Sequence, residues 1–328
     1  MPLHDHRRGL HAAMAGTGDP YAILTVERLA LCMGLHGGER IAAPHPELEP
    51  LVAASLLTVH NGTYRPNFFI ADREETALID QHARGIGAQL AERLLVRWLT
   101  IAAAYATLAI SRERSLAEMA FLLIGDRVLD VGLLDALAAD GALMPPAPAR
   151  PDPANPEARY YFWLIAGAAA HLGRYGQRAI PLPWPGWSLI TFGQYHLGAS
   201  SNAARDELEA GARQSLLAGE AQTPAALARS FALPSLGPED TGRWMAVERD
   251  CTADLLAVYH EAATDLRALH AGLRAGAGAP SSFGEFFCWY DHVAYAHAID
   301  ALIAAGVLSI PAARFAAMLW HDAGGGAF

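Results

Sequence analysis

The sequence predicts a mainly α-helical fold with small β-hairpins. Of its 328 residues, 52% are hydrophobic and 18% are charged, and alanine and other helix formers dominate. Only two stretches, residues 57–70 and 158–166, are rich in the β-branched and aromatic residues that favour strands. A chain of this length exceeds the usual size of one hydrophobic core, so we expect two or three domains.

The first 70 residues indicate a pair of helices closed by a hairpin. Residues 1–20 are polar, and we expect them to be frayed or disordered. Apolar residues then recur at helical spacing over 21–35 and 46–56. The pair Asn61-Gly62 lies between two strand-like runs, and both residues tolerate the positive φ angles of a two-residue turn. We therefore predict helix, turn, helix and hairpin across residues 21–70.

A long helix is expected next, over residues 73 to about 110. Asp72 can cap its first turn, where Glu75 also suits the helix dipole. The glycines of Gly85-Ile-Gly87 predict a break or bend. The apolar end, Trp98 to Ile110, has 13 residues, fewer than the roughly 20 that a membrane-spanning helix needs. We therefore expect a buried core helix and no membrane association.

A second unit with a similar layout follows. The tetrapeptide Ser115-Leu-Ala-Glu118 has the spacing of a capping box. A helix over 128–140 should end at Gly141, where a left-handed C-cap is least strained. The dense prolines of 145–156 exclude a helix or a central strand, so they predict an extended loop or long wing. Residues 159–165 would be the returning strand.

The rest of the chain predicts one irregular segment and then helices. Residues 171–202 are rich in glycine, proline and aromatic side chains, which indicates a loop packed on a domain surface. Helical patterns resume after it. The expected helices cover 203–218, 223–231, 241–274 and 284–306.

Aromatic side chains near this loop suggest a binding pocket for a small molecule. Such pockets combine many apolar walls with a few placed polar groups. The candidate ligand-binding residues are Tyr161, Trp163, Arg174, Tyr175, Trp184, Trp187 and Gln194. Plain hydrophobic packing would explain the same residues without any ligand.

A polar cluster near the carboxyl end suggests a different chemistry. Asp291 and Tyr295 share a helix face at i, i+4, and two antiparallel helices would bring His260 near His292 as a metal or acid–base pair. His297 follows His292 by five residues and lies well off that face. The alternative is that each histidine is satisfied separately. We assign no catalytic residue, metal or cofactor.

Charge argues against strong binding to nucleic acid. The net charge is -10, and all 24 basic residues are arginines, which also excludes a Schiff-base lysine and a P-loop lysine. The helices expected over 46–56 and 128–140 carry acidic residues where a recognition helix needs basic or amide side chains. Arg65 and Arg73, near the hairpin, are the candidate DNA-binding residues. We expect weak binding at most.

Cysteine usage and the amino terminus predict a cytoplasmic protein. Three cysteines at scattered positions, Cys32, Cys251 and Cys288, form no disulfide framework and no CxxC metal motif. No apolar stretch of a signal peptide follows the amino terminus.

The helix, turn, helix and hairpin over 21–70 resemble the winged helix-turn-helix superfamily, and 115–166 look similar with a longer wing. The resemblance implies two winged-helix-like modules, over 21–114 and 115–202, followed by a helical domain over 203–328. It also implies a regulator that binds DNA and senses a ligand or partner.

Three classes of function remain open. The first is a ligand-responsive regulator, and the second is a protein-interaction module that uses winged helices without nucleic acid. The third is an enzyme that uses the polar cluster of 259–297. A small-molecule ligand, weakly bound DNA, a protein partner and self-association into a homo-oligomer all stay open.

Overall fold

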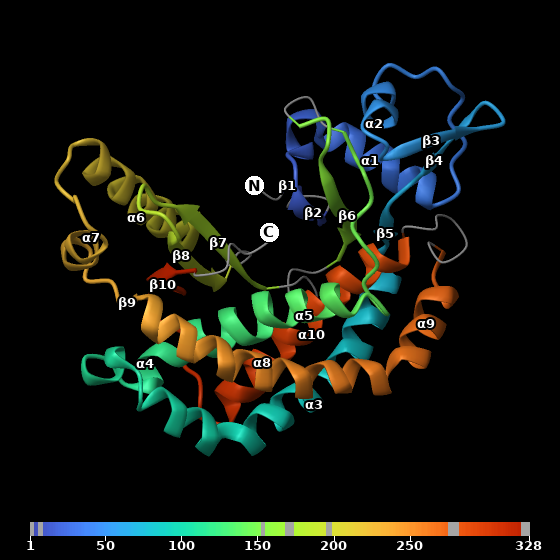
Figure 1. Ribbon diagram of the computed structural model, residues 1–328. Coiled ribbons are helices and arrows are strands. Elements are labelled where there is room, and N and C mark those ends of the chain that lie inside the picture. The colour runs from blue at the N-terminus through green and yellow to red at the C-terminus, as the bar shows by residue number, and fades with distance from the viewer. Residues whose placement is uncertain are drawn as a thin grey trace.

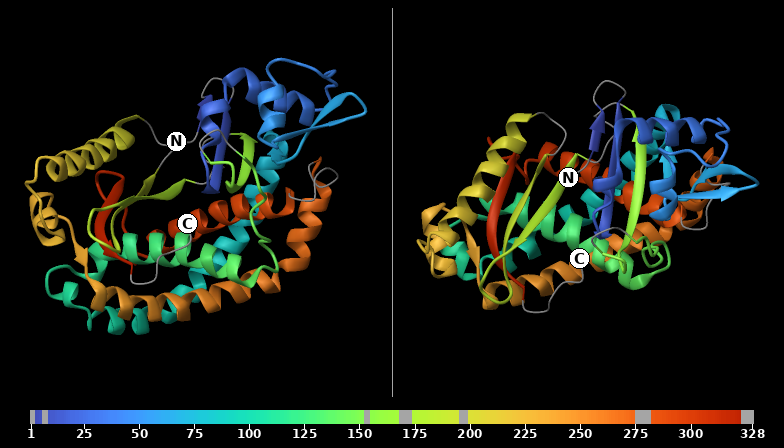
Figure 2. Two further views of the ribbon diagram at one scale, coloured as in Figure 1. Left: turned by 45° about the horizontal axis from the view of Figure 1, so that its top comes forward. Right: turned by 90° about the horizontal axis from the view of Figure 1, so that it is seen from above.

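Two lobes, each built around a sheet of four strands, stand on one side of a layer of helices (Figure 1, Figure 2). The computed structural model describes residues 3–5, 9–151, 155–167, 174–194, 199–274 and 282–322. The largest hydrophobic core lies within the helical layer, and each lobe has a smaller core of its own. The predicted class, mainly α with small β elements, is confirmed.

The helical layer is organised around its longest helix. Its elements are α3 (Arg73–Tyr105), η2 (Ala109–Arg112), α4 (Leu116–Ala120), the π-helix η3 (Phe121–Gly132), α5 (Leu133–Asp140), α8 (Pro238–Glu261), α9 (Ala263–Gly272) and α10 (Ser282–Ala304). Helix α3 packs along both α10 and α8. It begins at the predicted cap, because the Asp72 side chain accepts the backbone N–H groups of Glu74 and Glu75.

Helix α3 runs without a break through residues 85–87, where the sequence predicts a break or bend. A Cβ atom at Gly87 would lie 2.5 Å from the Cβ atom of His297 on α10. The glycine therefore allows close approach of two helices rather than a change of direction.

The first lobe contains a sheet with the order β1-β2-β6-β5. Its strands are β1 (Leu3–Asp5), β2 (Leu10–Thr17), β5 (Phe69–Ala71) and β6 (Arg159–Ala166). Strand β2 pairs antiparallel with β6 along its whole length, so the prediction of a frayed end is wrong for residues 10–17. Residues 1, 2 and 6–8 of the same prediction lie outside the described residues.

The predicted hairpin is confirmed in the first lobe. Strands β3 (Leu57–His60) and β4 (Thr63–Pro66) pair antiparallel around Asn61 and Gly62, whose φ angles are 49° and 73°. The helices before it are η1 (Pro20–Ile23), α1 (Val26–His36) and α2 (Glu49–Ala53). Helix α2 is shorter than the predicted 46–56 and follows α1 only after residues 37–48.

The second predicted unit is only partly as expected. The Ser115–Glu118 capping box is present, and Gly141 ends α5 with a φ angle of 69°. Helical residues are continuous from α4 through η3 to α5, and Asp130 is buried rather than on a solvent face. Residues 148–150 hydrogen-bond back to 158–160, as a wing would. Strand β6 then joins β2 and β5 instead of a local hairpin.

The prediction of an irregular loop over 171–202 is wrong for residues 175–194, which belong to the sheet of the second lobe. Residues 175–194 form a hairpin in a sheet with the order β7-β8-β10-β9. The strands are β7 (Tyr175–Pro181), β8 (Trp187–Gln194), β9 (Ser235–Leu236) and β10 (Phe315–His321), with helices α6 (Ala199–Leu217) and α7 (Pro224–Ser230) beside them. Pro183, Pro185 and Gly186 occupy the turn, whereas Gly176 and Pro181 lie within β7. Residues 171–173 and 195–198 lie outside the described residues.

Candidate functional site

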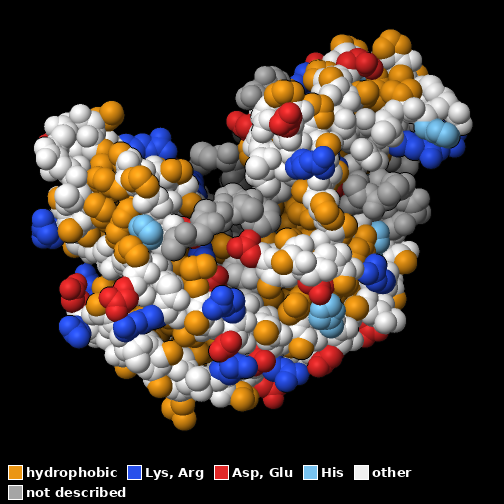
Figure 3. All heavy atoms as spheres, viewed as in Figure 1, with side chains coloured by type: hydrophobic (Ala, Val, Ile, Leu, Met, Phe, Trp, Pro, Cys, Tyr) orange, Lys and Arg blue, Asp and Glu red, His pale blue; other side chains and the backbone are white. Residues whose placement is uncertain are grey.

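Side chains from both lobes meet the helical layer along one row. The ring of Trp163 on β6 lies 5.6 Å from that of His292 on α10, and the His292 ring lies 5.4 Å from that of Tyr295. The Tyr295 hydroxyl donates to the backbone oxygen of Tyr175 on β7 at 2.7 Å. The Gln194 amide of β8 donates to the Tyr175 hydroxyl at 3.4 Å. Figure 3 shows that the molecular surface is hollowed between the two lobes.

Two buried polar atoms in this row have no hydrogen-bond partner among the described residues, and His292 lies beside one of them. Trp163 Nε1 and Gln194 Oε1 are buried and unsatisfied. His292 Nδ1 lies 2.7 Å from the carbonyl oxygen of Cys288, which can only accept, so Nδ1 carries the proton. Burial lowers the pKa of His292, so Nε2 holds a free lone pair at neutral pH. A buried polar atom without a partner is costly, and a bound molecule would remove that cost.

Three buried carboxyl groups lie close to this row. Burial raises the pKa of Asp126 to about 7, that of Asp130 to about 7 and that of Asp291 to about 8. Asp130 raises the pKa of the other two further, because like charges cannot both ionise easily at short range. At pH 7 Asp291 is therefore mostly protonated, whereas Asp126 and Asp130 lie near the midpoint of their titration.

Burial raises the pKa of Asp130, and two hydrogen bonds partly offset that effect. Its side chain bonds to the Tyr295 hydroxyl and to the backbone N–H of Gln177 on β7. When Asp130 is protonated it can donate to the Tyr295 oxygen, because the Tyr295 hydroxyl itself donates to the Tyr175 carbonyl oxygen. Asp130 and Tyr295 thus attach the second lobe to η3 and α10.

Two other predicted pocket residues lie next to this row, but their polar groups already have partners within the protein. Arg174 forms an ion pair with Asp300 of α10, which also accepts the Tyr175 hydroxyl at 3.1 Å. Its charge is therefore neutralised within the protein. The Tyr161 hydroxyl donates to the backbone oxygen of Pro145.

The last two predicted pocket residues lie elsewhere. Trp184 and Trp187 pack on the small core of the second lobe, whereas Trp163 belongs to the main core. The Trp184 indole donates to the backbone oxygen of Gln222 at 3.1 Å, and the Trp187 ring contacts that of His321. The structure therefore separates these two tryptophans from Trp163.

Within the part of the chain described, the two segments of the polar cluster of 259–297 meet only where Tyr259 contacts Asp291. His260 pairs with Asp140 at 3.3 Å, and His297 pairs with Asp80 of α3 at 2.9 Å. Asp291 accepts the Tyr259 hydroxyl at 2.7 Å. Each group has its own partner, so the expected meeting of His260 with His292 does not occur.

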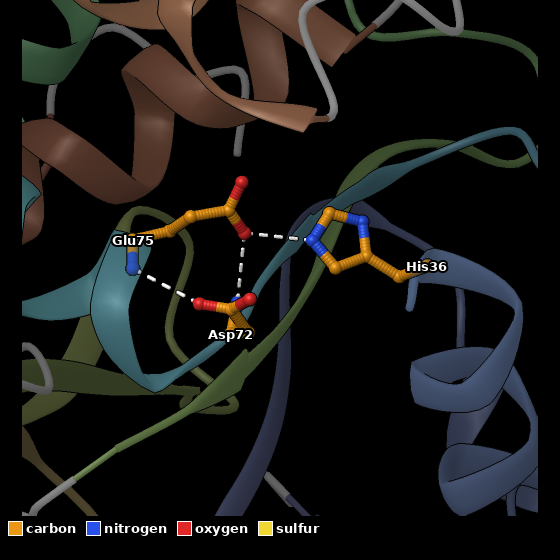
Figure 4. Close-up of side chains that lie close together, drawn as sticks. All are labelled: His36, Asp72 and Glu75. Atoms are coloured by element: carbon orange, nitrogen blue, oxygen red, sulfur yellow. Dashed lines mark hydrogen bonds and ion pairs between the residues drawn. The ribbon is translucent and has the colours of Figure 1, made fainter. Parts of the chain in front are cut away.

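A cluster that sequence reasoning missed joins three segments at the start of α3 (Figure 4). His36 of α1 lies 2.7 Å from Glu75 Oε2, which also accepts the backbone N–H of Asp72. Glu75 Oε1 accepts the backbone N–H of Arg274, whose guanidinium pairs with Asp72 at 2.9 Å. Burial alone would raise the pKa of Glu75, but these hydrogen bonds lower it overall. The capping box was visible in the sequence, whereas the histidine comes from a distant helix.

The ligand atoms of His36, Asp72 and Glu75 all lie within 4.8 Å of one another, a spacing that a metal ion would require. The chemistry fits poorly. The positive end of the α3 dipole and the Arg274 guanidinium both repel a cation. The carboxylates are already occupied by backbone and arginine donors, so the cluster is an anchor between segments.

The candidate DNA-binding residues are not arranged around a recognition helix. Arg65 is exposed on β4, and Arg73 is the first residue of α3. Helix α2 has five residues, and the two acidic side chains beside it are engaged. Glu47 pairs with Arg28 at 3.2 Å, and Glu49 accepts the Tyr64 hydroxyl.

Comparison with known proteins returned no relative, since no family model, no curated protein and no solved structure matches the chain. Among the helices described, none combines the length and the apolar character needed to cross a membrane.

Proposed function

We propose that this protein is a ligand-responsive regulator that binds a small polar molecule between its two lobes. One observation carries the proposal. Two buried polar atoms without a partner, of Trp163 and Gln194, lie with the His292 ring in one row that joins both lobes to α10. Pockets of this kind set a few polar groups among aromatic walls.

The free atoms define the chemistry of the ligand. Trp163 Nε1 offers one donor, and His292 Nε2 and Gln194 Oε1 offer two acceptors. The neighbouring arginine, Arg174, is neutralised by Asp300. A neutral, planar molecule with one acceptor and two donors, such as a heterocyclic amide, satisfies all three atoms.

Ligand binding at this position would favour one arrangement of the lobes. A molecule that contacts both Trp163 of the first lobe and Gln194 of the second binds most tightly to one distance between the lobes. Binding therefore increases the population of that arrangement. The first lobe also carries the exposed hairpin around Asn61 and Arg65. This hairpin is the surface that a regulated partner would contact.

A screen of neutral heterocyclic amides tests the proposal, with thermal stability and tryptophan fluorescence as readouts. Replacing His292 by phenylalanine removes one acceptor and should weaken binding about 10-fold, the equivalent of one hydrogen bond. The matched control is His260→Phe, a half-exposed histidine on α8 that should leave affinity unchanged. Equal affinity of the wild type and the His292 variant for every binding compound would contradict the proposal.

The second candidate, a protein-interaction module without nucleic acid, is favoured by the geometry around α2. The helix has only five residues, and the acidic residues Glu47 and Glu49 lie at its start. It therefore lacks the length and the basic side chains of a recognition helix that enters a major groove. The exposed edge of β3 offers backbone groups that a partner strand can pair with.

We predict that the free protein binds duplex DNA weakly or not at all. The net charge of -10 and the absence of lysine leave few groups to neutralise phosphates. Fluorescence anisotropy at about 50 and 200 mM salt measures the affinity and its salt dependence. Any residual binding should depend on Arg65, and Arg65→Ala should weaken all sequences alike. Tight, sequence-specific binding at physiological salt would refute this prediction.

A further inference from the structure

A short relay of hydrogen bonds leads to one of the two unpartnered atoms of the proposed pocket. Tyr175 and Gln194 lie opposite each other on β7 and β8, at the end of the hairpin away from its turn. Arg174 pairs with Asp300 Oδ2, and the Tyr175 hydroxyl lies 3.1 Å from Asp300 Oδ1. The Gln194 amide nitrogen lies 3.4 Å from the same hydroxyl, and Gln194 Oε1 has no partner. The relay therefore connects a partly exposed ion pair to a buried amide.

Asp300 sets the direction of every hydrogen bond in this relay. Its carboxylate, held in an ion pair with Arg174, has no proton to give and only accepts. The single Tyr175 hydroxyl proton therefore points to Asp300, which leaves the Tyr175 oxygen as an acceptor. Only the nitrogen of the Gln194 amide can donate to that oxygen, so Oε1 points away from it. The acceptor that Gln194 offers is thus determined two hydrogen bonds away.

We propose that Asp300 is a positioning residue that makes the site selective for ligands with a hydrogen-bond donor opposite Gln194. This inference rests on the proposed pocket, because it takes Gln194 Oε1 as a contact of the ligand. An amide that turns by half a rotation presents its nitrogen instead of its oxygen with little change in shape. Without a fixed partner, Gln194 would accept ligand donors and acceptors alike. Asp300 removes this ambiguity by acting through Tyr175.

Replacing Asp300 by asparagine is expected to reverse the relay. The Arg174 guanidinium carries only donors, so the oxygen of the new amide takes the place of Oδ2 beside it. The new nitrogen then takes the place of Oδ1 and donates to the Tyr175 oxygen. The Tyr175 proton turns to Gln194, whose amide flips to accept it. The site would then offer an N–H group where the wild type offers an oxygen.

Nicotinamide and methyl nicotinate test the selectivity, because the first carries an amide that donates and the second an ester that only accepts. Isothermal titration calorimetry on the full chain should show that the wild type binds the amide more tightly. In Asp300→Asn the ratio of the two affinities should shift toward the ester by at least about 10-fold, the equivalent of one hydrogen bond. Equal ratios in the wild type and in Asp300→Asn would overturn the proposal.

Two further variants separate the relay from a general effect on the fold. Tyr175→Phe removes the middle of the relay and lets the Gln194 amide adopt either orientation, so its ratio should lie between those of the wild type and Asp300→Asn. The matched control is Asp254→Asn of α8. Asp254 also pairs with an arginine and exposes 38% of its side chain, the same fraction as Asp300, and its replacement should leave the ratio unchanged.

A nuclear magnetic resonance measurement needs no ligand and separates this inference from the proposed pocket. In the free wild type, the Gln194 amide protons lie against the Tyr175 hydroxyl, so a nuclear Overhauser effect should link them to the Tyr175 ring. This effect should be lost in Asp300→Asn and kept in Asp254→Asn. A persistent effect in Asp300→Asn would overturn the proposal even if both probes bind. If the effect is lost but the wild type binds neither probe, Asp300 orients Gln194, whereas the proposed pocket and its selectivity are wrong.

Discussion

Replacing Arg150 by methionine is expected to lower the free energy of unfolding by about 3 to 5 kcal/mol, the usual effect of removing one partner of a buried ion pair. The side chains of Arg150 and Glu285 are exposed by only 1% and 0%. Arg150 also donates to the backbone oxygens of Asn67 and Tyr160. The variant would leave the Glu285 carboxylate buried without its cation.

Glu285 connects this arginine to the helical layer. Its oxygens accept the backbone N–H groups of Phe69 on β5 at 2.9 Å and Phe162 on β6 at 3.1 Å. One side chain of α10 thereby secures two strands of the first lobe and the loop that carries Arg150. Loss of the pair should loosen the junction between that lobe and the helices, and not only remove one contact.

Urea unfolding followed by circular dichroism measures the effect, with Arg97→Met as the matched control. Arg97 and its partner Asp254 expose 32% and 38% of their side chains, so this replacement should cost about 1 kcal/mol or less. Replacing both Arg150 and Glu285 by apolar residues should recover much of the loss, because no charge is then left buried. Equal destabilisation by Arg150→Met and Arg97→Met would show that the buried pair has no special role.

The parts of the fold that the sequence predicts correctly are set by neighbouring residues. The turn at Asn61-Gly62 and the caps at Asp72 and Ser115 depend on contacts within about four residues. The C-cap at Gly141 is equally local. Such signals can be interpreted without knowing the rest of the chain.

The two larger sheets were missed because their pairings are distant. Strand β2 pairs with β6, where the contact between Thr17 and Arg159 spans 142 residues. Strand β8 is buried along most of its length, on both faces, so it lacks the alternation that indicates a half-exposed strand. Each sheet also combines segments that the sequence assigns to separate units.

The candidate site was predictable only in part, for the same reason. Trp163, Tyr175 and Gln194 were identified from composition, but their meeting with His292 depends on the packing of α10 beneath both lobes. The aspartates of η3 could have been recognised from the sequence as unusual buried acids. Asp126 and Asp130 interrupt the apolar run of 121–134, where a charge is costly unless it is neutralised.

These buried aspartates lead to a prediction about pH. Their pKa values of about 7, 7 and 8 for Asp126, Asp130 and Asp291 lie far above the value of about 3.9 expected in the unfolded chain. Between these limits the folded protein binds more protons than the unfolded chain. Stability therefore decreases as pH rises, by up to about 1.4 kcal/mol per pH unit for each group.

The buried histidines affect stability in the opposite direction, and they limit the pH range in which the effect of the aspartates can be measured. Burial lowers the pKa of His292, and it also lowers that of His297 despite the hydrogen bond from that ring to Asp80. Their contribution is therefore lost as pH falls through the unfolded value of about 6.5. Above pH 7 the histidines are neutral in both states, so the slope from about pH 7 to 8 comes from buried carboxyl groups. These are the three aspartates together with Glu248 and Glu285, whose pKa values burial also raises to about 7.

Asp291→Asn is expected to be more stable than the wild type at pH 9 and to show a shallower loss of stability between pH 6 and 9. Asparagine is neutral at every pH, and its carbonyl oxygen can still accept the Tyr259 hydroxyl that Asp291 accepts at 2.7 Å. The replacement thus removes the cost of ionising a buried acid while it keeps the hydrogen bond. Urea unfolding at several pH values measures the slope, and Asp265→Asn, an exposed aspartate of α9, is the control that should leave it unchanged. If Asp291→Asn follows the wild-type curve across this range, ionisation of Asp291 does not destabilise the fold, and the prediction is wrong.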